Sequence, residues 1–245
     1  MTVGSVGETV AEQLQDLVLD SIDVMDFLAE LSEYSAALVA MPAGLKVECA
    51  VTLYRRRRSL TGAGSTARAR TLNNIQTGLG EGPCLTALQE SRTVLISDVA
   101  SDGRWPEYAT ALMLEGIHSV LAVPLVLEQG AAASLNFFSQ SPGAFTDAFR
   151  DSAERYASQA GKALRLAVRI GSKQQTVDDL QEAMKSRTTI DLAVGVIMGQ
   201  QQCSQSTAFG ILNRAASGRN KKLRDVAHDL LGKITDQSVE THFTQ

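Results

Sequence analysis

The stretch HSVLAVPLVLEQGAAASLNFFS, residues 118–139, contains two apolar runs on either side of Glu-Gln-Gly. Two such runs joined through a short glycine-containing turn predict a pair of antiparallel strands. Upstream, VECAVTLY (47–54) and TVLISDV (93–99) are also strand-like, and SLTGAGST (59–66) is the expected neighbour of VECAVTLY after a turn. The sequence therefore predicts an antiparallel sheet built outward from residues 118–139.

Helical patterns are interleaved with these strands. Apolar residues recur at spacings of three and four over 10–39, CLTALQES (84–91) and RWPEYATALMLEGI (104–117). Strands and helices that alternate through short connections indicate one α+β domain with helices flanking the sheet. We place this domain at residues 24–168, after an amphipathic helical segment at 1–23.

The chain is helical in pattern for a long way after Phe145. Residues 171–175, GSKQQ, are polar but contain no proline, so they form either a joint or part of an uninterrupted helix. Val177 and Met184 lie one heptad apart, which favours a coiled coil between two protomers of a homodimer at 169–186. The alternative is that this helix packs on its own sheet.

Three short amphipathic segments follow over residues 187–233. They are TTIDLAVGVIMGQQ (188–201), SQSTAFGILNRAASG (204–218) and KLRDVAHDLL (222–231), and each has one apolar face. Three such faces are enough for a small all-α, three-helix domain. We expect the remaining residues, 234–245, to be a flexible tail.

Charge is distributed unevenly along the chain. The formal net charge is −4, which argues against nucleic-acid or membrane binding by the whole surface, whereas residues 187–224 alone carry +5. Because a helix N-terminus is itself positive, Lys221 and Lys222 at the start of a helix are unfavourable unless an anion lies nearby. Phosphate is one interpretation of that anion, and a solvated, solubilising surface is the alternative.

The segment over about residues 180–233 resembles the ANTAR domain, the RNA-binding module of transcription antitermination regulators. The resemblance rests on Ala-Val-Gly-Val-Ile-Met at 193–198 and on Asn-Lys-Lys-Leu at 220–223, at matching spacing. It implies a dimer that binds paired RNA hairpins in nascent leader transcripts. Phe209 is expected in the core and not as a platform for a base. The residues expected to contact RNA are Arg187, Arg214, Arg219, Asn220, Lys221, Lys222 and Arg224.

The first domain resembles the GAF fold, as it occurs in actinobacterial proteins that join GAF to ANTAR. The resemblance rests on Gly-Glu-Gly-Pro-Cys at 80–84, Arg-Trp-Pro at 104–106 and Val-Pro-Leu at 123–125, in that order. It implies a sensor that binds a small molecule between sheet and helices, or a dimerising platform. Six polar or bulky residues at element ends are the candidates for the ligand pocket. They are Cys84, Asp98, Trp105, His118, Ser119 and Asn136.

These pocket candidates have a structural interpretation as well, as turn, cap or core residues, and no particular ligand is indicated. The three cysteines, Cys49, Cys84 and Cys203, are widely spaced without a CxxC motif, so we expect no disulfide framework and no metal site. A signal-peptide pattern and a long apolar run are also absent from the sequence. We therefore expect a cytoplasmic protein without a membrane partner.

An enzymatic alternative comes from the same fold, since some GAF proteins reduce free methionine sulfoxide. Cys84 would attack and Cys49 would resolve, but the cysteine spacing of those reductases is not matched, so we expect no enzyme. Two further alternatives are a redox sensor, in which oxidation of Cys84 alters the helix leading to the RNA-binding domain, and a protein-interaction scaffold.

Overall fold

The two strands predicted from residues 118–139 are present as β4 (Ser119–Leu125) and β5 (Ala131–Ser139). They pair antiparallel, with Leu121 opposite Phe137. The two strands are almost entirely buried, because helices cover both faces of the sheet. This explains why most residues of the two strands are apolar, and the polar side chains of Ser134 and Asn136 in β5 are buried as well.

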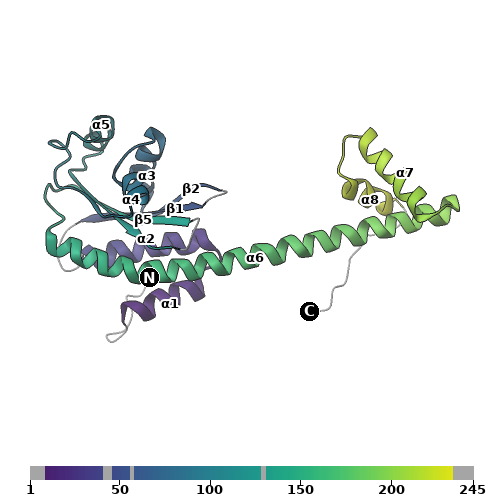
Figure 1. The fold of residues 1–245 in the computed structure, drawn as a ribbon, viewed down its shortest axis with the longest axis horizontal. Coiled ribbons are helices and arrows are strands. Elements are labelled where there is room, and N and C mark those ends of the chain that lie inside the picture. Colours follow the sequence, from purple (N-terminus) through teal and green to yellow (C-terminus); the bar gives the residue numbers. More distant parts are fainter. Residues whose placement is uncertain (1–8, 41–45, 56–57, 128–130, 234–245) are drawn as a thin grey trace. The chain divides into compact units, whose positions relative to one another are not determined.

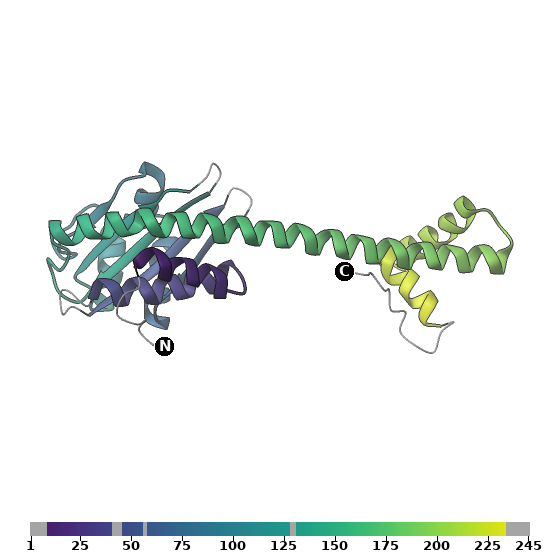
Figure 2. The same cartoon turned by 90° about the horizontal axis from the view of Figure 1, so that it is seen from below.

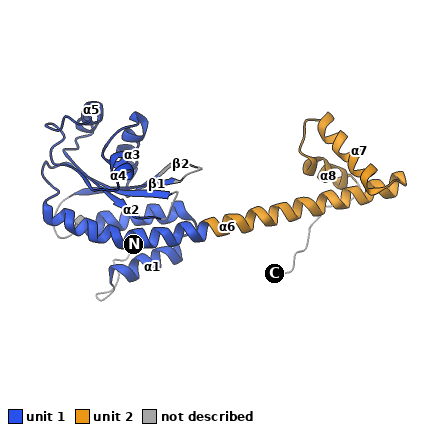
Figure 3. Ribbon diagram, in the orientation of Figure 1, with its two compact units in different colours: residues 1–171 blue, residues 172–245 orange. Residues whose placement is uncertain are grey.

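The chain divides into two compact units, residues 1–171 and 172–245 (Figure 3). The turn expected at 128–130 and the tail expected to be flexible at 234–245 lie outside the described residues. The computed structural model describes residues 9–40, 46–55, 58–127 and 131–233.

Three further strands complete the sheet of unit 1: β1 (Val47–Arg55), β2 (Arg58–Gly64) and β3 (Val94–Ile96). The strand order is β2-β1-β5-β4-β3, and every neighbouring pair is antiparallel. The predicted α+β architecture, an antiparallel sheet with flanking helices, is therefore confirmed.

One face of the sheet is covered by α2 (Val24–Ala40) and the first part of α6 (Asp147–Gln201), and α1 (Val10–Asp20) packs against α2 on the side away from the sheet, as Figures 1 and 2 both show. The core on this face is apolar, and small side chains allow α6 to lie close to the sheet. The small buried residues of α6 in this core are Ala153, Ala157, Ala160 and Ala167.

The single amphipathic pattern over residues 10–39 forms two helices, α1 and α2, and not one. The break is stabilised by Asp23, whose Oδ1 accepts hydrogen bonds from the backbone N–H groups of Met25 at 2.7 Å and Asp26 at 2.9 Å. A carboxylate that satisfies free N–H groups in this way starts a new helix. Periodicity alone missed this start because both helices bury apolar residues at helical spacing.

The opposite face of the sheet is covered by α3 (Ala67–Leu79), α4 (Pro83–Glu90) and α5 (Pro106–Leu114), as Figure 1 shows. The patterns at 84–91 and 104–117 predicted α4 and α5. Helix α3 was not predicted from the sequence. Its side chains contribute most of the polar contacts on this face, so the omission affects the interpretation of the site.

Residues 147–201 form the single helix α6, so the uninterrupted alternative for 171–175 is the one observed. Two amide side chains support the helix here, since Gln174 Nε2 donates to Asp178 and Gln175 Nε2 donates to Asp179, each at 2.9 Å. The short helix predicted at 188–201 is the last part of α6.

Unit 2 has the predicted three-helix core, formed by the end of α6 with α7 (Gln205–Gly218) and α8 (Leu223–Gly232). Small residues at the contacts allow the helices to approach closely. Within the described part of the chain, no helix combines the length and the apolar character needed to cross a membrane. The fully buried alanines of this core are Ala193, Ala208 and Ala227.

Candidate functional site

The space between the sheet and helices α3 and α4 is filled by polar side chains. We call these residues the buried polar cluster. All of them are at most 1% exposed, and they come from β1, α3, α4 and β5. The members are Thr52, Asn73, Gln76, Cys84, Ser134 and Asn136.

Asn136 lies at the centre of the buried polar cluster. Its Nδ2 donates to Asn73 Oδ1 at 2.9 Å and to Thr52 Oγ1 at 3.2 Å, while its Oδ1 accepts from Ser134 Oγ at 3.1 Å. Three segments far apart in the sequence therefore meet at one amide. Because buried polar groups are stable only when they are paired, this side chain helps to fix the position of α3 on the sheet.

Cys84 joins the buried polar cluster at the start of α4. Its backbone N–H donates to Gln76 Oε1 at 2.9 Å, and its Sγ lies 3.0 Å from Ser134 Oγ. The preceding Gly82 has φ +144, a conformation that favours glycine, and Pro83 occupies the first turn of the helix. Burial raises the pKa of the Cys84 thiol, so the group is neutral.

The two cysteines of unit 1 lie on opposite faces of the sheet. Cys49 belongs to the apolar core with α2 and α6, whereas Cys84 lies on the α4 side, against Ser134. Burial raises the pKa of the Cys49 thiol too. Two neutral thiols separated by a sheet cannot act as an attacking and a resolving pair.

Tyr108 of α5 is buried, and its hydroxyl has no hydrogen-bond partner among the described residues. Burial raises the pKa of Tyr108. The hydroxyl is therefore neutral and able to donate. A buried donor without a partner is unusual in a folded protein, and it makes this side of the sheet a candidate site for a ligand that accepts a hydrogen bond.

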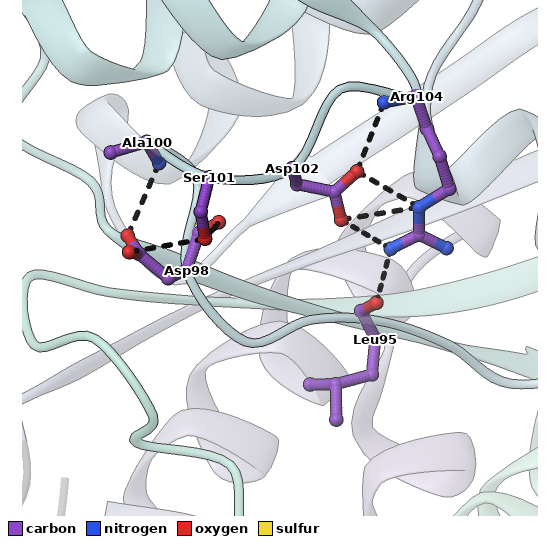
Figure 4. Close-up of polar contacts among 6 residues, drawn as sticks. All are labelled: Leu95, Asp98, Ala100, Ser101, Asp102 and Arg104. Atoms are coloured by element: carbon purple, nitrogen blue, oxygen red, sulfur yellow. Dashed lines mark hydrogen bonds and ion pairs between the residues drawn. The ribbon is translucent and has the colours of Figure 1, made fainter.

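Asp98, one of the pocket candidates, stabilises the turn after β3, as Figure 4 shows. Its Oδ1 accepts from the backbone N–H of Ala100 at 3.1 Å, and its Oδ2 accepts from Ser101 Oγ at 3.3 Å. Both carboxylate oxygens therefore have partners in their own loop. In this structure Asp98 has the structural role that the sequence analysis gave as its alternative.

Trp105 is partly buried and packs against the apolar residues on the side of the sheet that α3, α4 and α5 cover. The guanidinium of Arg104 lies over its ring, 4.7 Å from the centroid. Arg104 is itself fixed by Asp102, to whose Oδ1 its Nε donates at 3.0 Å, and by the carbonyl of Leu95 (Figure 4). The hydrogen bonds that Arg104 donates to Asp102 hold the pKa of the Asp102 carboxyl below its ordinary value. The loop before α5 is thereby tied to β3.

The last two pocket candidates, Ser119 and His118, form hydrogen bonds at the end of the sheet. Ser119 Oγ donates to the carbonyl of Ser141 at 2.8 Å, and the backbone N–H of His118 donates to the carbonyl of Ser139 at 2.9 Å. The structure thus joins only Cys84 and Asn136 in one hydrogen-bonded network. Sequence reasoning missed Asn73 and Gln76, the partners that α3 supplies.

In unit 2, five of the seven candidate residues lie at the connection between α7 and α8, and the other two, Arg187 and Arg214, lie in α6 and α7. We call residues 219–222, Arg-Asn-Lys-Lys, the basic turn. Asn220 has a positive φ of +49, and the backbone N–H of Lys221 donates to the carbonyl of Ala216 at 3.1 Å. Asparagine tolerates this conformation better than most residues, so the turn places all four side chains at the surface.

Three of the seven predicted RNA contacts are paired with carboxylates of unit 2. Lys221 Nζ lies 2.9 Å from Asp229, Arg224 contacts Glu182 and Asp225, and Arg187 Nε lies 3.7 Å from Asp191. The protein therefore supplies part of the negative charge that the start of α8 requires. The remaining cations, Arg214, Arg219 and Lys222, are exposed and have no ion pair among the described residues.

The prediction that Phe209 lies in the core is wrong, because this residue of α7 is 45% exposed. Three apolar residues of α6 in unit 2, Val177, Leu180 and Met184, are also 45–60% exposed. They recur at spacings of three and four along the helix, which places them on one face.

Among the described residues, no group of three or more His, Cys, Asp or Glu side chains is placed to hold a metal ion.

Comparisons with known proteins identify both parts of the chain. The family model described as GAF domain matches residues 5–165, and the model described as ANTAR domain matches residues 178–231. No curated protein sequence matches the chain.

Solved structures resemble unit 1 at low identity. The N-acylhomoserine lactone-dependent LuxR-family transcription factor CepR2 of Burkholderia cenocepacia has 11% identity and a TM-score of 0.50, over 67% of this chain and 96% of its own. The GAF domain of the Acinetobacter phosphoenolpyruvate-protein phosphotransferase has 16% identity and a TM-score of 0.46, over 66% and 95%. The reduced form of fRMsr from Staphylococcus aureus has 20% identity and a TM-score of 0.44, over 67% and 99%. At these identities the likeness concerns the fold alone.

Proposed function

The chain belongs to the GAF domain family and carries an ANTAR domain after its GAF domain, and from this premise we propose that it is a signal-responsive regulator of transcription antitermination. Its ANTAR domain binds paired hairpins in nascent leader transcripts, and its GAF domain governs when binding occurs. A protein with this task works where transcription takes place, in the cytoplasm.

The observation that carries the proposal is that three of the predicted RNA contacts are exposed cations that have no carboxylate partner among the described residues. Arg219 and Lys222 lie in the basic turn, and Arg214 lies in α7. Cations that need no internal partner are free to neutralise phosphates, and they release counterions when they do so. We assign these three residues to the RNA backbone, because phosphate contacts set affinity and register and not sequence preference.

The other predicted contacts have a second task. Lys221, Arg224 and Arg187 have carboxylate partners, so they exchange an ion pair for a phosphate when RNA arrives. Asn220 contributes its amide at the tip of the basic turn. Because exposed ion pairs contribute little to stability, this exchange is not expected to unfold the domain.

A homodimer is needed to occupy two hairpins together. The exposed apolar face of α6 at Val177, Leu180 and Met184 has heptad spacing, which favours a two-stranded coiled coil around residues 169–186. Arg187 lies one heptad after Leu180, and a charged side chain at this position weakens the contact between the two helices of the coiled coil. A marginal coiled coil allows a signal to shift the population of dimer arrangements, and two linked heads bind two hairpins with avidity.

The sensor function belongs to the α3, α4 and α5 side of the sheet. The hydroxyl of Tyr108, which has no hydrogen-bond partner among the described residues, is a donor that a small ligand would satisfy near Cys84. We keep Asp98, Trp105, His118 and Ser119 as residues that shape the surrounding loops. The ligand itself is not assigned.

We propose that the protein is not an enzyme. A methionine sulfoxide reductase of the GAF type would need two cysteines within reach, and Cys49 and Cys84 lie on opposite faces of the sheet. A redox sensor that uses Cys84 is disfavoured for a related reason, since a buried neutral thiol reacts slowly with oxidants.

The test measures RNA binding by the full chain. The probe is a pool of synthetic RNA hairpins with a constant stem and a randomised loop, presented singly and as tandem pairs. We expect tandem pairs to bind more tightly than single hairpins. The double variant Arg219→Ala/Lys222→Ala should lower affinity and reduce the slope of log K against log salt by about two.

The matched control removes two exposed cations of unit 1, in the variant Lys162→Ala/Arg165→Ala. It should leave both affinity and salt slope unchanged. The absence of hairpin binding at low salt would show that the proposed function is wrong, while equal loss in both double variants would show that the basic turn is not the site.

A further inference from the structure

The three helices of unit 2 enclose a groove with a volume of about 410 Å³. The end of α6, one side of α7 and one side of α8 line it. It adjoins the basic turn, since Arg219 belongs to both. The seven residues predicted from sequence to contact RNA include only this one member of the groove, so most of the groove has no assigned task.

The groove has an apolar floor and a polar rim. Ile197, Leu212 and Val226 are buried at the floor, and Ile211 and Leu230 are partly buried beside them. The exposed residues of the rim are Gln200, Gln201, Arg219, Asp229 and Lys233.

The charge of the rim is positive on balance. Arg219 and Lys233 are cationic, and the carboxylate of Asp229 is paired with Lys221 at 2.9 Å. The hydrogen bond from Lys221 keeps the pKa of Asp229 below its ordinary value, so this side chain remains an acceptor. The rim thus combines cations for phosphates with amide and carboxylate groups that can bind the edge of a base.

We propose that this groove binds one unstacked nucleobase from the loop of a hairpin RNA. This inference rests on the proposed RNA binding and specifies which part of the RNA the protein recognises. A nucleotide combines a flat base with a phosphate on either side of its sugar, which matches an apolar floor with two cations on its rim. Single-stranded loop bases are the parts of RNA that proteins recognise by stacking and edge contacts.

The dimensions favour a base over a protein partner. A volume of 410 Å³ lies at the small end of ligand sites, which is appropriate for one ring system, whereas a stable protein interface needs a much larger surface. Among the described residues, none of those that line the groove is aromatic. The base therefore stacks on aliphatic side chains such as Ile211 and Leu230 and on the guanidinium plane of Arg219.

The test fills the groove without changing charge. Ala215 lines the groove on α7, and leucine is a good helix former, so Ala215→Leu adds volume there. From the same hairpin pool we take the tightest binder and compare it with versions that carry an abasic nucleotide at each loop position. One abasic position should lower the affinity of the full chain on the order of tenfold to a hundredfold.

Ala215→Leu should reduce the affinity for the intact hairpin to that of the abasic hairpin, with an unchanged salt slope. The matched control Asn213→Leu adds the same side chain at an exposed position of α7 and should bind normally. The variant Gln200→Ala/Gln201→Ala changes only exposed residues and should lower affinity for the intact loop alone, which keeps the test decisive if Ala215→Leu folds poorly.

Several outcomes overturn the inference. Equal binding of intact and abasic loops shows that no base is read. Normal binding by both groove variants assigns the groove to a protein or to residues 234–245, and loss confined to Phe209→Ala places the base on the opposite side of α7. Failure of every hairpin to bind removes the proposed function as well, so the two failures are distinguishable.

Discussion

The buried polar cluster of unit 1 and the basic turn of unit 2 are both polar, but they differ in burial and pairing. In the cluster every member is at most 1% exposed and hydrogen-bonded to another member. In the basic turn all four side chains are exposed, and Arg219 and Lys222 have no carboxylate partner among the described residues. The first set is needed for the fold, whereas the second is free to act on another molecule.

The largest effect should come from disturbing the buried polar cluster through its backbone. A Cβ at Gly82 would lie 2.8 Å from Gln76 Cβ and 2.9 Å from Gln76 Oε1, at a φ of +144. Gly82→Ala should therefore combine backbone strain with loss of the Gln76 hydrogen bond to Cys84 and lower the free energy of unfolding of unit 1 by about 3–4 kcal/mol. Trp105, the single tryptophan, reports this unfolding by fluorescence in urea.

The matched control for this change is Gly78→Ala. Gly78 lies in α3 with ordinary φ, and a Cβ there would meet nothing within 4 Å. The same substitution should then be neutral or stabilise the helix by about 0.5–1 kcal/mol. Similar losses at both glycines would mean that the start of α4 has no special role in holding the cluster together.

A smaller loss should follow from removing the central amide of the cluster. Asn136→Ala deletes three hydrogen bonds, but Thr52 and Ser134 each keep another partner. We expect unit 1 to lose about 2–3 kcal/mol, measured again by Trp105 fluorescence in urea. Asn74→Ala, at an exposed position one residue beyond Asn73 in α3, should change stability by less than about 0.5 kcal/mol. Equal effects would contradict the view that burial distinguishes these asparagines.

The same contrast explains how much the sequence could predict. Strands β4 and β5, helices α7 and α8 and the cations between them follow from local composition and spacing. The partners of Cys84 do not, because Cys84 and Ser134 lie 50 residues apart in the chain. Such contacts depend on how strands and helices pack, and local periodicity contains no information about that.

Helix α3 was predictable in part. Thr66 accepts a hydrogen bond from the backbone N–H of Ala69 as its N-cap, and Gly80 ends the helix with a positive φ of +75. Threonine before a helix and glycine after it are recognised boundary signals. Leu72, Ile75 and Leu79 also lie at helical spacing, so the sequence contained signals for this helix that the prediction overlooked. Asn73 and Gln76 were missed with it.

The smallest effect on stability should come from the basic turn, and that result would sharpen the contrast most. Lys222 is the N-cap of α8 but its side chain makes no capping hydrogen bond, so Lys222→Ala removes charge and no described contact. Hydrogen exchange at the α8 amides should change by no more than about 0.5 kcal/mol in opening free energy. Val226→Ala, in the core of unit 2, should lower protection clearly and shows that the measurement is sensitive. If Lys222→Ala lowered the hydrogen-exchange protection of α8 as much as Val226→Ala, the basic turn would be needed for folding. It could then not be treated as a surface that is available only for RNA binding.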